Sequence, residues 1–103
     1  MARSVRWTLA ALDDLDQAAK YIARDSATYA AAFVRDALST ARSLQQYAER
    51  GRIVPEFEQD NIRELFVGSY RLVYRVGDRV EILAIIHGAR DAGAVWDCRD
   101  PKD

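Results

Sequence analysis

Arginine supplies most of the side chains in this sequence whose chemistry could serve a site. The fifteen basic residues include only two lysines, Lys20 and Lys102. A planar guanidinium pairs with carboxylates or phosphates through two parallel hydrogen bonds, so this composition favours contacts that depend on geometry. Arg71 and Arg75 alternate on one face of a segment with strand periodicity. Such a pair is typically solvated or ion-paired, so by itself it indicates a surface rather than a catalytic centre.

The other candidates for chemistry lie toward the C-terminus. His87, the only histidine, ends an apolar run and has no cysteine, histidine or carboxylate neighbours at ligand spacing. This pattern predicts a structural hydrogen bond and no metal site, and nothing in the sequence indicates a cofactor. Trp96 lies in a polar stretch, where a tryptophan anchors a tail or contributes to an interface. Cys98 is the single cysteine, which excludes an internal disulfide and fits a reducing compartment.

Composition and charge limit the classes of function. The chain has 103 residues, which suits one domain over residues 1–103, with residues 91–103 expected to be a charged tail. Proteins that grip nucleic acid backbones usually carry a positive excess, but here the net charge is −1, so we expect no direct DNA binding. Neither a signal peptide nor an apolar run approaching the roughly 20 residues of a membrane helix is present, so we expect a cytoplasmic protein without membrane contact.

The first half of the sequence predicts two helices after a short strand. Residues 5–8 have strand periodicity, and Thr8 can cap a helix whose apolar residues recur up to Ile22. Ser26 can cap a second, longer helix with a continuous apolar stripe from Ala30 to Leu44. Gly51 stands where a left-handed helix C-cap is expected. The short break between the helices predicts an antiparallel helical hairpin.

After a loop over residues 51–61, the period changes from helical spacing to alternation. Residues 62–67, 70–76 and 79–87 are predicted strands joined by two tight turns, which gives an antiparallel meander. The last strand is apolar on both faces and should lie centrally. The sequence therefore predicts an α+β domain: an N-terminal strand, then a helical hairpin packed on one face of an antiparallel sheet. The other face, with Arg71, Val73, Leu83 and Ile85, is expected to be partly open.

Two segments resemble the RelE/ParE superfamily of toxins. Residues 62–76, IRELFVGSYRLVYRV, match its strand–turn–strand pattern, and residues 80–91, VEILAIIHGARD, resemble the ParE side of the family. The helical hairpin and the GRIVPE entry at residues 51–56 match in order and spacing, so the resemblance covers residues 4 to about 91. It implies the toxin of a type II toxin–antitoxin system, whose partner is a cognate antitoxin.

The resemblance leaves two targets, and the residues that would cut RNA discriminate between them. RelE-like toxins cleave mRNA on the ribosome with two lysines, two arginines and a tyrosine, whereas ParE-like toxins inhibit DNA gyrase. The arginines correspond to Arg71 and Arg90, but the lysines fall on Ile62 and Glu64, and the tyrosine falls on Trp96. A second nuclease style would use Glu56, but its His-Tyr pair falls on residues 89 and 90 and is absent. General acid–base groups are therefore missing, which favours gyrase inhibition.

The partly open sheet face and the exit of the last strand provide a set of expected site residues. The expected antitoxin contacts are Arg71, Val73, Arg75, Leu83 and Ile85; the expected target contacts are His87, Arg90 and Trp96. If the chain were a nuclease, its catalytic candidates would be Arg71, Arg90 and Glu56. A third possibility, from a different class, is a degenerate toxin that binds antitoxin without a live target.

Overall fold

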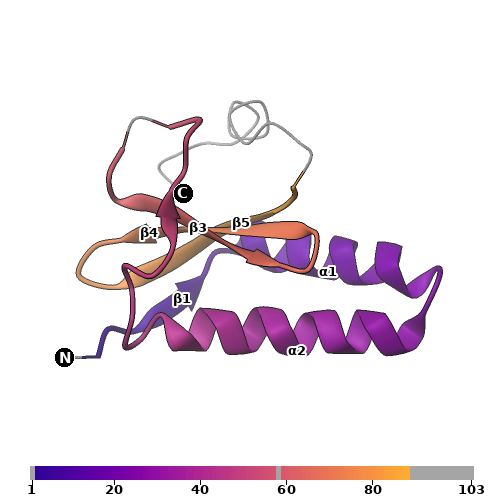
Figure 1. Ribbon diagram of the computed structural model, residues 1–103. Helices are drawn as coiled ribbons and strands as arrows, with labels where there is room; N and C mark the ends of the chain where they lie inside the picture. The colour runs from indigo at the N-terminus through magenta and orange to yellow at the C-terminus, as the bar shows by residue number, and fades with distance from the viewer. Residues whose placement is uncertain (1, 58, 89–103) are drawn as a thin grey trace.

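The computed structural model describes residues 2–57 and 59–88, which form two helices and a five-stranded sheet. The elements are β1 (Val5–Trp7), α1 (Leu9–Ala23), α2 (Ala27–Ser43), β2 (Arg52–Ile53), β3 (Ile62–Val67), β4 (Tyr70–Val76) and β5 (Val80–His87). Figure 1 shows the two helices on one side of the sheet, and the loop between β2 and β3 projecting from the other side. This is the α+β architecture that the sequence predicts.

The helical hairpin begins as its capping residues predict. The Thr8 hydroxyl accepts a hydrogen bond from the Ala11 amide (3.1 Å), and the Ser26 hydroxyl accepts one from the Tyr29 amide (3.1 Å). Both contacts satisfy amides that the first turn of a helix leaves without partners. Thr8 also donates to the carbonyl of Ile82 (2.9 Å), so this cap fixes the start of α1 against β5.

The sheet order is β1-β5-β4-β3-β2, so β5 lies between β1 and β4, as its two apolar faces predict. The pairs within β2, β3, β4 and β5 are antiparallel, whereas β1 pairs with β5 in parallel. The helical hairpin carries the chain from β1, at one edge of the sheet, to β2, at the opposite edge, and the meander then brings β5 back beside β1. Residues 52 and 53, expected in a loop, form the edge strand β2 instead.

The prediction that Gly51 caps the second helix is wrong. Helix α2 ends at Ser43, and its C-cap is Leu44 in the right-handed region. Gly51 is required for a close approach: a Cβ there would lie 2.5 Å from Tyr74 Oη and 2.6 Å from the carbonyl oxygen of Glu64. The Gly51 amide donates to Tyr74 Oη (2.9 Å), which joins the loop to the centre of the sheet.

A β-bulge decides which side chains of β5 face the helices. Val73 pairs with Ala84 and Tyr74 pairs with Ile82, so Leu83 is an extra residue in β5. The extra residue reverses the alternation, and Ile85 therefore packs in the core beneath the helices, while Leu83 lies on the opposite face. The prediction that Ile85 shares a face with Val73 is wrong for this reason. The Ile85 amide donates to a carboxylate oxygen of Asp14 on α1 (3.0 Å).

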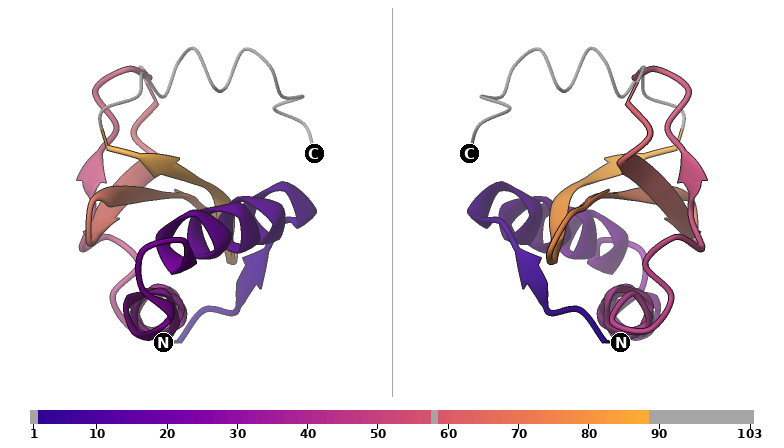
Figure 2. Two further views of the ribbon diagram at one scale, coloured as in Figure 1. Left: turned by 90° about the vertical axis from the view of Figure 1, so that its right-hand side faces the viewer. Right: turned by 90° about the vertical axis from the view of Figure 1, so that its left-hand side faces the viewer.

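Hydrophobic cores lie on both faces of the sheet. The larger one, between the sheet and the helices, includes Phe33, Leu44, Leu72, Tyr74 and Ile82. The second lies on the far face and consists of Val54, Ile62, Val73, Leu83, Ala84 and Ile86, with Phe57 packed against it. Figure 2 shows the loop that carries Val54 and Phe57 on the side of the sheet away from the helices. Residues 54–57 are called the strap below.

The far face is therefore buried, and the expectation that it is partly open is wrong. Arg71, Val73 and Leu83 are each at most 4% exposed. The sequence did not indicate this burial, because the strap comes from a loop whose apolar residues, Val54 and Phe57, have no strand or helix periodicity. The predicted tail at residues 91–103, with Trp96, lies outside the described residues, as does Arg90.

Candidate functional site

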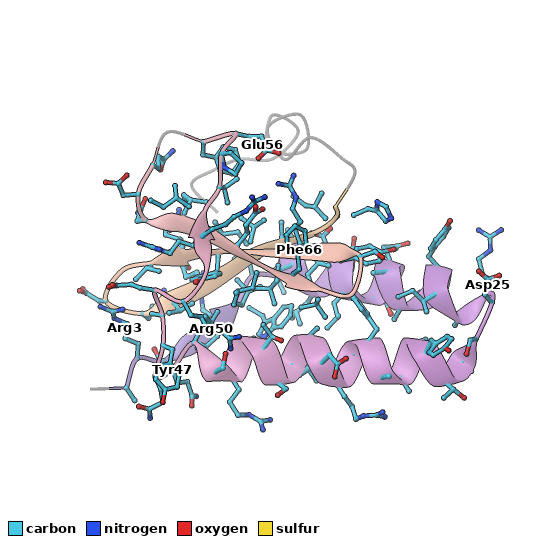
Figure 3. The ribbon with its side chains drawn as sticks, in the orientation of Figure 1. Arg3, Asp25, Tyr47, Arg50, Glu56 and Phe66 are labelled. Atoms are coloured by element: carbon cyan, nitrogen blue, oxygen red, sulfur yellow. The ribbon has the colours of Figure 1, made fainter. Side chains whose placement is uncertain are left out.

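Arg71, the leading catalytic candidate, is buried in contact with two carboxylates. Its Nη1 and Nη2 donate to Glu56 (3.2 and 2.7 Å), and Nη1 also donates to Glu64 (3.0 Å). The Arg71 side chain is 5% exposed and that of Glu64 is fully buried. Glu56, labelled in Figure 3, comes from the strap, whereas Glu64 comes from the neighbouring strand β3. The structure thus brings Arg71 and Glu56 together, as an ion pair.

Charge in this cluster is balanced. Glu64 also accepts a hydrogen bond from Nε of Arg52 on β2 (2.6 Å), so two arginines face two glutamates. The hydrogen bond to Glu56 raises the pKa of Arg71 above its ordinary value; burial opposes this shift, and the charge of Glu64 adds to it. Arg71 therefore stays charged, but its charge is already compensated by groups of the chain itself.

A second ion-paired network crosses the same face near the other edge of the sheet. Arg75, an expected antitoxin contact, donates to Glu81 on β5 (2.9 Å), and Arg6 on β1 pairs with the same carboxylate. These hydrogen bonds, first from Arg6 and then from Arg75, lower the pKa of Glu81 to about 2. The network connects three strands of the sheet, which is a structural role.

His87 lies on the other side of the sheet from Arg71. It pairs with Tyr70 across β4 and β5, and its ring meets the Tyr70 ring edge-on with 5.3 Å between centroids. Tyr70 belongs to the helix side, where it packs against Phe33 with 5.1 Å between ring centroids. Neighbours along a strand point to opposite faces, so Arg71 and His87 cannot act on one scissile phosphate.

An aromatic groove lies next to His87, and the sequence analysis did not identify it. Its volume is about 440 Å³, and its lining residues are Tyr21, Ile22, Tyr29, Ala32, Phe33, Asp36, Gly68, Ser69, Tyr70 and His87. Tyr21 and Tyr29 are 62% and 72% exposed, which is unusual for large aromatic rings. The signal was present in the sequence, because both tyrosines flank the break between the helices and stand outside the apolar stripe.

Residues 2–57 and 59–88 contain no group of three histidine, cysteine or acidic side chains placed to hold a metal ion. No helix within the same residues is long and apolar enough to cross a bilayer.

This arrangement, a helical hairpin on a mostly antiparallel sheet with an arginine in the YRLVY strand, defines a class of protein. The ParE toxins of type II toxin–antitoxin systems (parDE) match over residues 5–92. A Sinorhizobium fredii protein, the candidate toxin Y4kP, is 33% identical over 87 residues, which cover 82% of this chain and 88% of the relative.

Solved structures agree. A chain of the chromosomal ParDE system from P. aeruginosa superposes with a TM-score of 0.67 and 29% identity, covering 84% of this chain and 96% of that one. A chain of the RelBE2 toxin–antitoxin complex from Mycobacterium tuberculosis gives a TM-score of 0.58 and 26% identity, covering 84% and 99%. The protein is a member of the RelE/ParE superfamily. Within it, the chain belongs to the ParE toxin family of type II toxin–antitoxin systems.

Proposed function

We propose that this toxin arrests growth by inhibiting DNA gyrase and that it does not cleave RNA. The observation that carries the proposal is the state of Arg71, which is buried between Glu56 and Glu64. A ribonuclease needs an arginine that is available to the phosphate and an acid–base pair beside it. Here a phosphate would have to displace Glu56 and would then meet the buried Glu64 carboxylate. His87 lies on the opposite face.

The test is a pair of assays with the same purified toxin. We expect inhibition of gyrase supercoiling and no ribosome-dependent cleavage of mRNA. Cleavage at the ribosome would overturn the proposal and would restore Arg71, Arg90 and Glu56 as catalytic candidates. If the wild-type chain neither inhibits gyrase nor cleaves mRNA, and does not arrest growth, it is the degenerate toxin.

We propose further that a cognate antitoxin neutralises the chain in the cytoplasm. The solved structures it resembles come from toxin–antitoxin systems, one of them a complex. Arg71, Val73 and Leu83 are buried on the face that the strap covers, so an antitoxin could reach them only by displacing the strap, and Ile85 is buried beneath the helices. The aromatic groove is accessible instead, and its exposed tyrosines suit the apolar side chains of a segment that folds on binding.

Binding to the antitoxin can be tested by co-expression with the product of the adjacent small open reading frame. We expect a stable complex with the wild-type chain and a weaker one with Tyr29→Ala. Arg35→Ala is the matched control, because Arg35 is an exposed residue of the same helix that does not line the groove. An unchanged affinity of Tyr29→Ala would exclude the groove as the antitoxin site. Failure to co-purify would contradict the antitoxin proposal itself.

A further inference from the structure

A second concavity lies where α2 ends, away from the aromatic groove. It has a volume of about 450 Å³, and its lining residues are Arg3, Gln46, Tyr47, Ala48, Glu49 and Arg50. In Figure 3, Arg3, Tyr47 and Arg50 gather at one end of α2, and Asp25 marks the opposite end of the hairpin. The 17 residues of α2 separate these ends by roughly 25 Å, at about 1.5 Å per residue. The two concavities share no lining residue, so they can be occupied at the same time.

The backbone around this concavity is well fixed. The Arg3 amide donates to the carbonyl of Gln45 (2.9 Å), which attaches the N-terminal segment to the end of α2. The Arg50 amide donates to the carbonyl of Tyr47 (3.1 Å), and Arg50 Nη1 donates to the hydroxyl of Ser43 (2.7 Å). Ala48 is 5% exposed and belongs to the main core, so the turn cannot move freely. A preorganised surface of this kind loses little conformational entropy on binding.

The two arginines that line this concavity differ from four arginines on the sheet. Arg6, Arg52, Arg71 and Arg75 each pair with a carboxylate. Among the described residues, Arg3 and Arg50 form no ion pair, although Glu49 lines the same concavity. Arg63 adds a third guanidinium nearby, since its Nη1 donates to the carbonyls of Glu49 (3.3 Å) and Gly51 (2.8 Å). This end of the molecule thus has a local positive excess.

Tyr47 supplies the apolar element of the surface. Its side chain is 68% exposed, beside the two arginines that line the same concavity. Tyrosine and arginine are the residue types that contribute most to protein–protein interfaces, and arginine pairs bidentately with carboxylates. Within residues 2–57 and 59–88, no side-chain hydrogen bond or ring contact accounts for the exposed ring.

We propose that Arg3, Tyr47 and Arg50 form the contact surface for an acidic segment of the toxin's protein target. The proposal rests on the proposed function, because it places the acidic segment on the toxin's protein target rather than on the antitoxin. A protein segment fits better than single-stranded nucleic acid for two reasons. The chain has a net charge of −1, and the concavity is one isolated site containing Glu49 rather than a basic track along which a phosphate backbone could run.

The experiment compares the full-length wild-type chain with Tyr47→Ala, the double variant Arg3→Ala/Arg50→Ala, and the control Arg35→Ala. For each we would measure growth arrest on induction, affinity for purified gyrase, affinity for the antitoxin, and melting temperature. We expect Tyr47→Ala and the double variant to abolish growth arrest and to weaken gyrase binding roughly 10- to 30-fold. Antitoxin affinity and melting temperature should stay at wild-type values, and Arg35→Ala should match the wild type throughout.

Each readout separates one failure from another. Wild-type growth arrest by Tyr47→Ala and by the double variant would overturn the proposal, and so would a loss of antitoxin affinity instead of toxicity. A wild-type chain that arrests growth without binding gyrase would refute the proposed target. The surface would then still be supported if Tyr47→Ala abolished arrest. If the wild-type chain bound labelled single-stranded (dT)10 and Tyr47→Ala did not, the surface would be a nucleic-acid site. The proposal of a protein segment would then be overturned.

Discussion

At the level of single residues, Arg71 lies at a family position but in an ion-paired environment. Its place in the YRLVY strand is that of a catalytic arginine in RelE-like toxins, yet Glu56 and Glu64 bind it here. Glu64 occupies a position where the resemblance would place a lysine. Glu64 therefore places a carboxylate where a lysine would face a phosphate, and this carboxylate binds Arg71 and Arg52. The three side chains form an ion-paired network.

Removing Arg71 alone should therefore affect folding rather than chemistry. Arg71→Met leaves the buried Glu64 carboxylate with Arg52 only, so we expect a loss of about 1–3 kcal/mol, less than the cost of a buried charge left wholly uncompensated. The double variant Glu64→Leu/Arg71→Met removes both charges and should recover much of this loss. Urea unfolding of both variants and the wild type measures the difference. Equal stability of Arg71→Met and the wild type would show that the network contributes nothing.

At the level of elements, short irregular segments decide which residues are accessible. The bulge at Leu83 turns Ile85 toward the helices, and the strap covers the far face with Val54 and Phe57. Gly51 permits the strap to begin where it does, because Tyr74 Oη and the Glu64 carbonyl leave no room for a side chain. These three features together convert the expected open face into a second core.

Gly51→Ala should consequently destabilise the protein by about 1–3 kcal/mol, the usual cost of overpacking a core. The added methyl would lie 2.6 Å from a backbone carbonyl oxygen, which cannot rotate away. Gly77→Ala is the matched control, since the nearest atom to its Cβ would be 3.7 Å away. Thermal and urea unfolding compare the two. A Gly51→Ala variant as stable as Gly77→Ala would contradict the close approach.

At the scale of the whole molecule, the concavities proposed as binding surfaces are distinct from the buried face of the sheet. Two of the accessible concavities lie toward opposite ends of the helical hairpin, one aromatic and one rich in arginine. The sheet between them is connected by ion pairs, including the Arg6–Glu81–Arg75 network that spans β1, β5 and β4. A toxin built in this way can engage two partners without rearranging its core.

The Glu81 network predicts how stability depends on pH. The pKa of Glu81 is lowered from 4.5 to about 2 in the folded chain, so its contribution is complete above pH 4.5 and is lost as the pH falls toward 2. Because its side chain is 15% exposed, we expect a contribution of about 1–3 kcal/mol after allowance for solvent screening. In urea unfolding, Glu81→Gln should be less stable than the wild type at pH 7, and the gap should close near pH 2. A gap that is the same at both pH values would contradict the assigned pKa.

His87, Arg90 and Trp96 remain predicted target contacts, and His87 also lines the aromatic groove proposed for the antitoxin. Truncation tests Arg90 and Trp96 together with the tail. Removing residues 90–103 should abolish growth arrest while leaving antitoxin binding and melting temperature unchanged, because binding groups concentrate beyond rigid strands. A single Trp96→Ala variant separates the tryptophan from the rest of the segment. Lower melting temperature in either variant would assign Trp96 to the core instead, and surviving toxicity would remove it from the target site.

The sequence by itself determined the helical hairpin, the meander, the central place of β5 and the family. Those features depend on local periodicity, on capping by Thr8 and Ser26, and on the order of motifs, all of which can be identified from the sequence alone. The tertiary structure alone decided which face each residue of β5 presents, that Arg71 is neutralised, and where the accessible surfaces lie. A bulge shifts alternation by one residue, and the contacts of Arg71 join three separate segments, the strap, β3 and β4. Periodicity carries no information about such contacts, because they depend on where separate segments meet in space.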